Sequence, residues 1–302
     1  MGLTQLRLDF DWSRIEPIEG DFSWTATDRI VSAARARGIK VHGLLTYTPA
    51  WARPPGTNEK HPPTRDADFA NFSRAVVERY RSQGISSWEV WNEPNIPNFW
   101  SAAGGPDANR YATLLNASAV AIHSADPAAT VVTGGLAPAV DTAGVSIAPG
   151  TFLTRLFATL DSGIVQGVAI HPYSYPALPT SALSWNTFAR LPEFQQIVAV
   201  GEGRALPIWI TEFGAPTGSS SSAVSTADQA AIVQDALSCL LGVSWIGPVF
   251  LYNMRDRTGG NPNDVEDNFG LLRADWSSKP VVAVLQTHIT DPGSFGTGCA
   301  GW

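Results

Sequence analysis

The feature of this 302-residue chain that most restricts its fold is a regular alternation of short apolar runs with amphipathic helical patterns. The apolar runs have the length and composition of strands that are covered on both faces, and they occupy 3–10, 39–45, 87–91, 130–134, 165–170, 207–211 and 248–253. The helical patterns occupy 27–37, 66–81, 109–123, 151–160, 188–200, 226–241 and 280–289. Seven strand–helix units in this order predict parallel strands that are connected by helices.

The long loops of the chain all follow predicted strands, whereas the loops that precede strands are short. The long loops are 46–65, 92–108, 171–185, 213–224 and 254–279. In an α/β barrel such loops form the face at the carboxyl ends of the strands, where active sites lie. A doubly wound sheet is the alternative, but no glycine-rich fingerprint follows the first strand. We therefore expect an α/β fold of the TIM (β/α)8 type, in a single domain over 1–302 with an irregular tail at 291–302.

Composition and charge exclude several classes of protein. Hydrophobic residues make up 44% of the chain, which excludes disorder, and the net charge of −7 argues against a nucleic-acid partner. No apolar run approaches the roughly 18 residues of a membrane span, and no signal peptide is visible at the start. No two histidines are spaced as metal ligands. We expect neither a metal nor an organic cofactor. Cys239 and Cys299 are either bonded to each other or free thiols.

Two glutamates stand where predicted strands end. Glu93 lies in the segment 88–95 (WEVWNEPN), and Glu212 lies in the segment 209–214 (WITEFG). Glycoside hydrolysis needs one carboxyl group that protonates the leaving oxygen and a second one that attacks the sugar or activates water. A single glutamate at a strand end is as readily explained by a hydrogen bond that fixes a loop, but two of them in aromatic surroundings favour the catalytic interpretation.

The segments WNEP and ITEFG resemble clan A glycoside hydrolases, close to families five and thirty-nine. The opening 7–17 (RLDFDWSRIEP) is similar to the second strand of that clan, and 268–272 with 279–280 is similar to the approach to its last helix. The resemblance implies a retaining (β/α)8 enzyme in which Glu93 is the acid/base and Glu212 is the nucleophile. It also implies that Asn92 holds the 2-hydroxyl group of the sugar.

The same resemblance assigns further residues to the sugar site. Arg7 is similar to the arginine of the clan that hydrogen-bonds the nucleophile, and the alternative is an ion pair of Arg7 with Asp9 or Glu89. His171 and a nearby tyrosine, Tyr173 or Tyr175, are expected to line the site, with the tyrosine hydroxyl on the nucleophile. The alternative for His171 is a structural histidine, and His42 is expected to be structural.

Aromatic residues in or near the loops after strands have two interpretations, stacking on a sugar ring or packing in the core. They are Tyr47, Trp51, Trp100, Trp185 and Trp276. Trp51 and Trp100 are favoured as sugar contacts because their loops flank the expected catalytic strands. The clan often places a tryptophan at the end of its last strand, and Tyr252 in the segment 250–254 is the candidate substitute here.

The count of strands differs from the clan by one. Glu93 ends the third predicted strand and Glu212 the sixth, whereas the clan uses strands four and seven. The chain is therefore expected to start at the family's strand two and to lack the first β/α unit. A shortened chain, a misplaced start codon and a barrel completed by another segment or chain are the alternatives. The unpaired edges of a seven-stranded barrel allow association, and the oligomeric state stays open.

The expected function is retaining hydrolysis of β-glycosidic bonds in an oligo- or polysaccharide, with endo action. Retention requires the two carboxyl groups to lie roughly 5–5.5 Å apart. The alternatives are a carbohydrate-binding barrel without turnover and a transglycosylase that uses the same glutamates. By analogy with the family we expect secretion. The lack of a visible leader does not count against secretion, because the native start is expected to be missing.

Overall fold

The computed structural model describes residues 2–295, 299 and 302, and it divides into two compact units. The larger unit consists of Thr4–Ile170 together with Glu193–Trp209. The smaller unit consists of His171–Pro192 and Ile210–Trp302, with the first residues of the chain.

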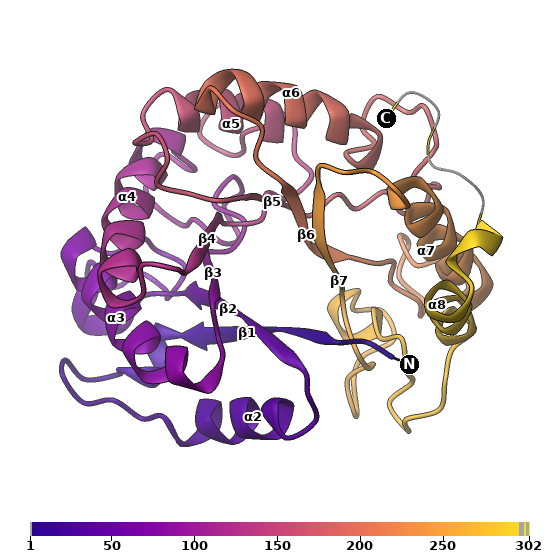
Figure 1. Ribbon diagram of the computed structural model, residues 1–302, viewed down its shortest axis with the longest axis horizontal. Helices are drawn as coiled ribbons and strands as arrows, with labels where there is room; N and C mark the ends of the chain where they lie inside the picture. Colours follow the sequence, from indigo (N-terminus) through magenta and orange to yellow (C-terminus); the bar gives the residue numbers. More distant parts are fainter. Residues whose placement is uncertain (1, 296–298, 300–301) are drawn as a thin grey trace. The chain divides into compact units, whose positions relative to one another are not determined.

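A four-stranded parallel sheet forms the centre of the larger unit, in the order β1-β2-β3-β4 (Figure 1). The strands are β1 (Gln5–Asp11), β2 (Lys40–Thr46), β3 (Ser87–Val90) and β4 (Thr130–Thr133). The register pairs Asp11 of β1 with Thr46 of β2, so the carboxyl ends of these two strands lie level. This places the loops that follow β1, β2 and β3 at the same edge of the sheet.

Helices cover one face of this sheet (Figure 1). They are α2 (Thr25–Arg35), α3 (Asp66–Tyr80), α4 (Ala108–Ala125) and α5 (Pro149–Phe157), with a short α1 (Trp12–Ile15) directly after β1. Helix α4 begins where the Asp107 carboxylate accepts hydrogen bonds from the backbone N–H groups of Asn109 and Arg110. Helices α3 and α4 pack side by side, and their buried aromatic residues join Trp12, Trp88 and Trp91 in the core.

A second sheet has three strands, β5 (Val168–Ile170), β6 (Ile208–Phe213) and β7 (Ile246–Leu251), in the order β5-β6-β7. Strand β6 starts in the larger unit and ends in the smaller one. Helix α6 (Leu191–Glu202) follows β5. All seven strand–helix units predicted from the sequence are therefore present among the described residues, with bounds that differ by a few residues. The short helix α1 was not predicted, because four residues are too few for a periodic pattern.

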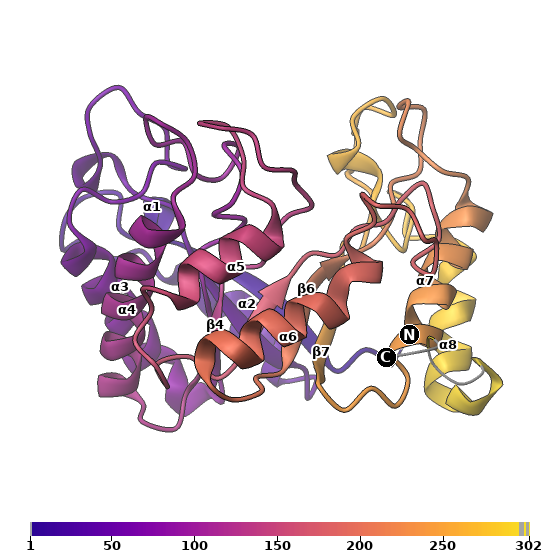
Figure 2. The same cartoon turned by 90° about the horizontal axis from the view of Figure 1, so that it is seen from above.

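Helices α7 (Thr226–Leu240) and α8 (Val281–Thr290) lie side by side in the smaller unit (Figures 1 and 2). The hydroxyl of Ser225 caps α7 by accepting a hydrogen bond from the Asp228 N–H group. A disulfide joins Cys239 of α7 to Cys299, which decides between the bonded and the free alternatives. Part of the predicted irregular tail forms a short 3₁₀ helix over Pro292–Phe295, and 296–298 and 300–301 lie outside the described residues.

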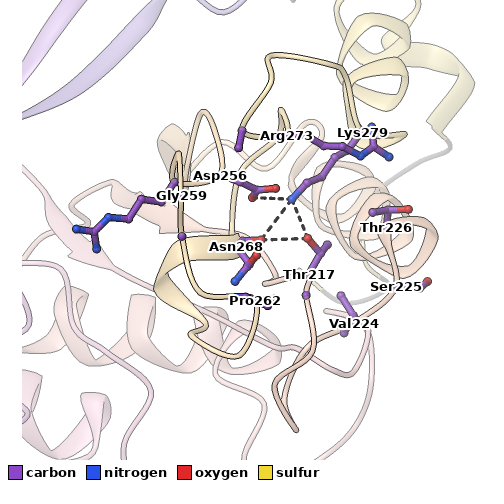
Figure 3. A pocket seen from close by; sticks show the side chains of 14 residues that line it. Thr217, Val224, Ser225, Thr226, Asp256, Gly259, Pro262, Asn268, Arg273 and Lys279 are labelled. Carbon is purple, nitrogen blue, oxygen red and sulfur yellow. Dashed lines mark hydrogen bonds and ion pairs between the residues drawn. The ribbon is translucent and has the colours of Figure 1, made fainter.

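A buried lysine ties together the loops of the smaller unit (Figure 3). The Lys279 ammonium group donates hydrogen bonds to Thr217 Oγ1 and Asp256 Oδ1, both at 2.8 Å, and to the Asn268 carbonyl at 3.3 Å. These contacts form one wall of a pocket of about 490 Å³. Burial lowers the pKa of Lys279, and the hydrogen bond to Asp256 opposes that shift. The loops after β6 and β7 are thus held to one cation.

None of the helices in the described part of the chain is long and apolar enough to cross a membrane.

Candidate active site

A buried carboxylate, Glu89 on β3, organises the carboxyl ends of the strands in the larger unit. Its Oε2 accepts a hydrogen bond from Arg7 Nε at 2.7 Å, and its Oε1 accepts from Arg7 Nη2 at 3.0 Å. The N–H group of Gly135 donates to Oε1 at 2.9 Å, and His42 Nε2 lies 3.4 Å from Oε2. Burial by itself would raise the pKa of Glu89, but the charge of Arg7 and the contact with His42 hold it well below its usual range. The ion pair of Arg7 with Glu89, one of the two alternatives, is therefore present.

Arg7 also positions Asn92, the residue before Glu93. Its Nη2 donates to Asn92 Oδ1 at 2.8 Å, and the side chain of Arg7 is almost buried. Because the carbonyl oxygen of Asn92 is engaged, its NH₂ group is the part that remains available to a ligand, without an acceptor among the described residues. The two N–H groups of an amide that is held in one orientation can donate hydrogen bonds to a sugar hydroxyl.

The backbone around Glu93 adopts an unusual conformation. Trp91 has φ 71° and Glu93 has φ 44°, a region that non-glycine residues rarely occupy. The N–H group of Glu93 donates to the Gly135 carbonyl at 3.0 Å, and a Cβ on Gly134 would lie 2.6 Å from the Trp91 carbonyl oxygen. Only glycine permits this close approach of the two loops. Strained backbone of this kind is concentrated at functional sites. Here it sets the orientation of Glu93, whose side chain is buried.

The aromatic candidates of the larger unit differ in their surroundings. Trp100 is fully buried against Trp91 and Tyr111, so the structure favours the core alternative for this residue. Trp51 is half-buried, and its indole N–H group donates to the Glu16 carbonyl at 2.9 Å. Tyr47 is nearly buried, and the ammonium group of Lys60 lies over its ring, 3.0 Å from the centroid. That ring face is therefore not available for stacking on a sugar, which the sequence could not indicate.

Glu212 near the end of β6 is the corresponding carboxylate of the smaller unit. Tyr173 donates its hydroxyl hydrogen bond to Glu212 Oε2 at 2.8 Å. The Nδ1 atom of His171 lies 3.7 Å from the same oxygen, and its Nε2 atom lies 3.0 Å from Thr211 Oγ1. His171 is fully buried, whereas Glu212 is partly exposed. Tyr173, one of the two tyrosines that the resemblance proposed, therefore contacts Glu212.

Tyr252 directly follows β7 and packs against Phe269, with ring centroids 5.2 Å apart. Its hydroxyl group donates to Glu266 Oε2 at 2.9 Å, and burial raises its pKa well above the usual range. Phe269 also contacts Tyr173 and Tyr175, which makes it the centre of an aromatic cluster. The sequence reasoning missed Phe269 and Glu266, although their position in a long loop after a strand was a usable signal.

Two other aromatic candidates are exposed. Trp185 is 48% exposed and Trp276 is 64% exposed. Trp276 lies against the guanidinium group of Arg255, whose central carbon is 4.2 Å from the ring centroid. Both side chains therefore have surface that a ligand can reach.

Comparisons with known proteins point to one clan. The family model described as "Glycosyl hydrolase family 10" matches residues 9–104. A "Thermostable celloxylanase" of Thermoclostridium stercorarium is 34% identical over 100 residues, which make up 28% of this chain and 26% of that protein. A family 39 glycoside hydrolase from Bacteroides cellulosilyticus WH2 has a TM-score of 0.74 at 26% identity, covering 94% of this chain and 58% of that one. A monomeric beta-xylosidase from Caulobacter crescentus CB15 has a TM-score of 0.72 at 19% identity, over 96% of this chain and 62% of that one.

The fold and these similarities define the class first. The chain has an α/β fold with parallel strands of the TIM (β/α)8 type, which confirms the predicted fold class. Within that class it resembles the clan A glycoside hydrolases, close to families five and thirty-nine, as its motifs predicted. The chain spans less than two thirds of each of the relatives named above.

Proposed function

We propose that this chain carries the catalytic part of a retaining glycoside hydrolase that acts on β-linked sugars. The observation that carries the proposal is the placement of two glutamates, Glu93 after β3 and Glu212 near the end of β6. The two strands are three strand–helix units apart, the spacing that the resemblance requires. The names of two similar proteins, a celloxylanase and a beta-xylosidase, support a β-linked substrate.

In this mechanism Glu212 attacks the anomeric carbon. The hydrogen bond from Tyr173 stabilises the ionised carboxylate and orients it, and His171 adds a polar neighbour on the same oxygen. When the glycosyl–enzyme bond forms, Glu212 loses its negative charge. The second step releases the carboxylate again, and the Tyr173 hydroxyl is in place to donate a hydrogen bond to it.

Glu93 protonates the leaving oxygen and afterwards removes a proton from the water that releases the sugar. Asn92 donates a hydrogen bond to the 2-hydroxyl group of the sugar, an interaction that strengthens in the transition state. Arg7 holds Asn92 in place before the substrate arrives, which lowers the cost of orientation during the reaction.

We further propose endo action on a chain substrate and export of the protein. The long loops after the strands, with Trp185 and Trp276 exposed, support contact with more than one sugar unit. The disulfide between Cys239 and Cys299 supports export, because disulfides persist in oxidising compartments.

The test is turnover of aryl β-xylosides and β-glucosides by the wild-type chain and by Glu93→Ala and Glu212→Ala. We expect each substitution to lower kcat by about 10²–10⁴-fold or more. Azide should restore Glu212→Ala with an inverted glycosyl azide as product, and Glu93→Ala with a retained one. Glu78→Ala, an exposed carboxylate on α3, is the matched control and should keep full activity.

Two outcomes would contradict the proposal. A wild-type chain that binds glycans but turns none of them over is a carbohydrate-binding barrel. A chain whose products lengthen with added sugar acceptor is a transglycosylase. On a polysaccharide, release of single sugars from the start would exclude endo action, and retention of the protein inside the cells that make it would contradict the proposed export.

A further inference from the structure

Lys60 is a polar side chain that the proposed mechanism leaves unexplained. It lies in the long loop between β2 and α3, and its side chain is only 21% exposed. The ammonium group lies 3.0 Å from the centroid of the Tyr47 ring and 5.1 Å from that of Phe99. Aromatic faces attract a cation in this way, so the two rings hold the ammonium group in one place.

The Lys60 ammonium group has no hydrogen-bond acceptor among the described residues. The carboxylate oxygen closest to it is Glu59 Oε1, at 4.0 Å. An ammonium group carries three donors, and a partly buried donor without an acceptor is costly. Burial accordingly lowers the pKa of Lys60, although the charges of Glu59, Asp11 and Asp9 oppose that shift. The N–H groups that do not point at the two rings are thus available to oxygen atoms that the described residues do not supply.

The loop that carries Lys60 is fixed on both sides. The Lys60 N–H group donates to Asn58 Oδ1 at 3.0 Å, and the Lys60 carbonyl accepts from the Ser101 N–H group at 3.2 Å. The Ser101 hydroxyl also donates to Asn58 Oδ1, at 2.8 Å. Lys60 is therefore attached to the loop that follows β3, the loop that begins with Asn92 and Glu93.

The charges around Lys60 select the kind of ligand. Asp9 and Asp11 stand on the same face of β1, at its carboxyl end, and both act on Lys60 electrostatically. Glu59 adds a third carboxylate and Arg14 a second positive charge, so the charged groups that act on Lys60 are mainly negative and do not favour an anion. These surroundings match a neutral polyol, whose hydroxyl groups both accept and donate hydrogen bonds.

We propose that Lys60 is a specificity-determining residue that donates hydrogen bonds to hydroxyl groups of a neutral sugar unit bound at the carboxyl ends of β1–β3. Tyr47 supports the ammonium group in this arrangement and does not stack on the sugar. The inference rests on the proposed function, since it names how that site chooses its substrate.

The first test compares Lys60→Met with Lys40→Met. Both substitutions remove one positive charge, but Lys40 stands at the opposite end of β2 and is exposed. We expect Lys60→Met to raise the dissociation constant of xylobiose and of cellobiose by about 10–100-fold, the loss of a hydrogen bond from a charged group. Lys40→Met should change it less than twofold, and Lys60→Arg should retain much of the affinity. Titration calorimetry gives these constants without turnover, and an equal effect of both methionine variants would overturn the proposal.

A double-mutant cycle separates the support role of Tyr47 from stacking. If Tyr47 acts through Lys60, Tyr47→Leu and Lys60→Met should each weaken binding, and the double variant should lose little more than Lys60→Met alone. Additive losses would show that the Tyr47 ring contacts the sugar itself.

A third readout does not depend on the stability of the variants. The chain has three lysines, so a protein labelled with ¹⁵N in its lysines gives three side-chain signals at most. Xylobiose should shift the Lys60 signal and leave the Lys40 signal in place. The wild-type chain should also bind xylobiose at least about tenfold more tightly than a disaccharide that carries a uronate. A preference for the uronate would overturn the neutral-ligand assignment.

The outcomes distinguish this inference from the proposed function. Turnover with an unmoved Lys60 signal would remove the inference alone. Sugar binding that depends on Lys60 without any turnover would remove the hydrolase proposal and keep the inference. A wild-type chain that binds none of these sugars would overturn both.

Discussion

In each of the two units a cation holds loops at the strand ends, and the two cations differ in chemistry. Arg7 is almost buried and Lys279 is buried. In the larger unit Arg7 contacts both oxygens of the Glu89 carboxylate and also reaches Asn92. In the smaller unit Lys279 distributes its donors over Thr217, Asp256 and the Asn268 carbonyl. A planar guanidinium group imposes directions on its partners, whereas an ammonium group acts as a point charge. The first cation therefore orients a candidate sugar contact, and the second one ties loops together.

Removing the carboxylate partner of Arg7 should have the largest effect. Glu89→Ala leaves a buried guanidinium group without its main partner, which we expect to lower the free energy of unfolding by about 3–5 kcal/mol. Urea unfolding measures the loss. Glu78→Ala is the control and should stay within about 0.5 kcal/mol of the wild type. If the two variants unfold alike, Arg7 is not the organising cation of the larger unit.

Opening the disulfide should lower the free energy of unfolding about as much as Glu89→Ala does, or slightly less. Cys239 and Cys299 are 60 residues apart, and a crosslink that closes a loop of this length contributes about 4 kcal/mol in the chain-entropy model. We expect a matching fall in the stability of the double serine variant, measured by urea unfolding. A wild-type chain that loses no stability under strong reductant would contradict this.

Removing the second cation should cost less than removing Glu89. Lys279→Met keeps most of the side-chain volume but leaves Asp256 and Thr217 without their donor, at a cost of about 1–3 kcal/mol. Asp256 is partly exposed, so water replaces some of the lost interaction. A loss larger than that of Glu89→Ala, measured under the same conditions, would reverse the comparison between the units.

Acid should remove the contribution that the Arg7–Glu89 pair makes to stability. The pKa of Glu89 is lowered on folding, so its stabilising contribution is complete above its unfolded pKa of about 4.3 and is lost as the pH falls through the lower folded value. Glu89→Gln should therefore show a shallower decline in stability below about pH 4.3 than the wild type does. Equal slopes for the two proteins would contradict the direction of this pKa shift.

Removing a helix cap should lower the free energy of unfolding least, and by a similar amount in the two units. Asp107 caps α4 in the larger unit and Ser225 caps α7 in the smaller one. Alanine at either position should lower the free energy of unfolding by about 1 kcal/mol. A clear difference between the two variants would show that one of the units depends more strongly on its helix ends.

Much of the fold was predictable because its signals are local. Hydrophobic periodicity is a property of neighbouring residues, and it placed the strands and helices within a few residues of their bounds. The position of Glu93 and Glu212 at strand ends follows from the same local signals. The expected single domain, the missing first unit and the roles assigned to the site residues stay predictions.

Other features were not predictable, because they depend on residues that are distant in the sequence. Trp100 had two interpretations until its neighbours Trp91 and Tyr111 were in place around it. No sequence pattern indicated that Lys60 would cover the ring of Tyr47, since the loop between them has no periodicity. The sequence indicated Glu89 only as one alternative partner of Arg7, although Glu89 is the centre of the hydrogen bonds that join Arg7 and Gly135.

The sequence by itself determined the order of strands and helices and the chemical groups at the strand ends, because a strand or helix is specified by the spacing of its own residues. Only the tertiary structure decided which of those groups meet. Arg7 and Glu89 are 82 residues apart, and Cys239 and Cys299 are 60 apart. Such pairs form because the packed strands and helices bring them within bonding distance, and the spacing of residues along the chain carries no information about that distance.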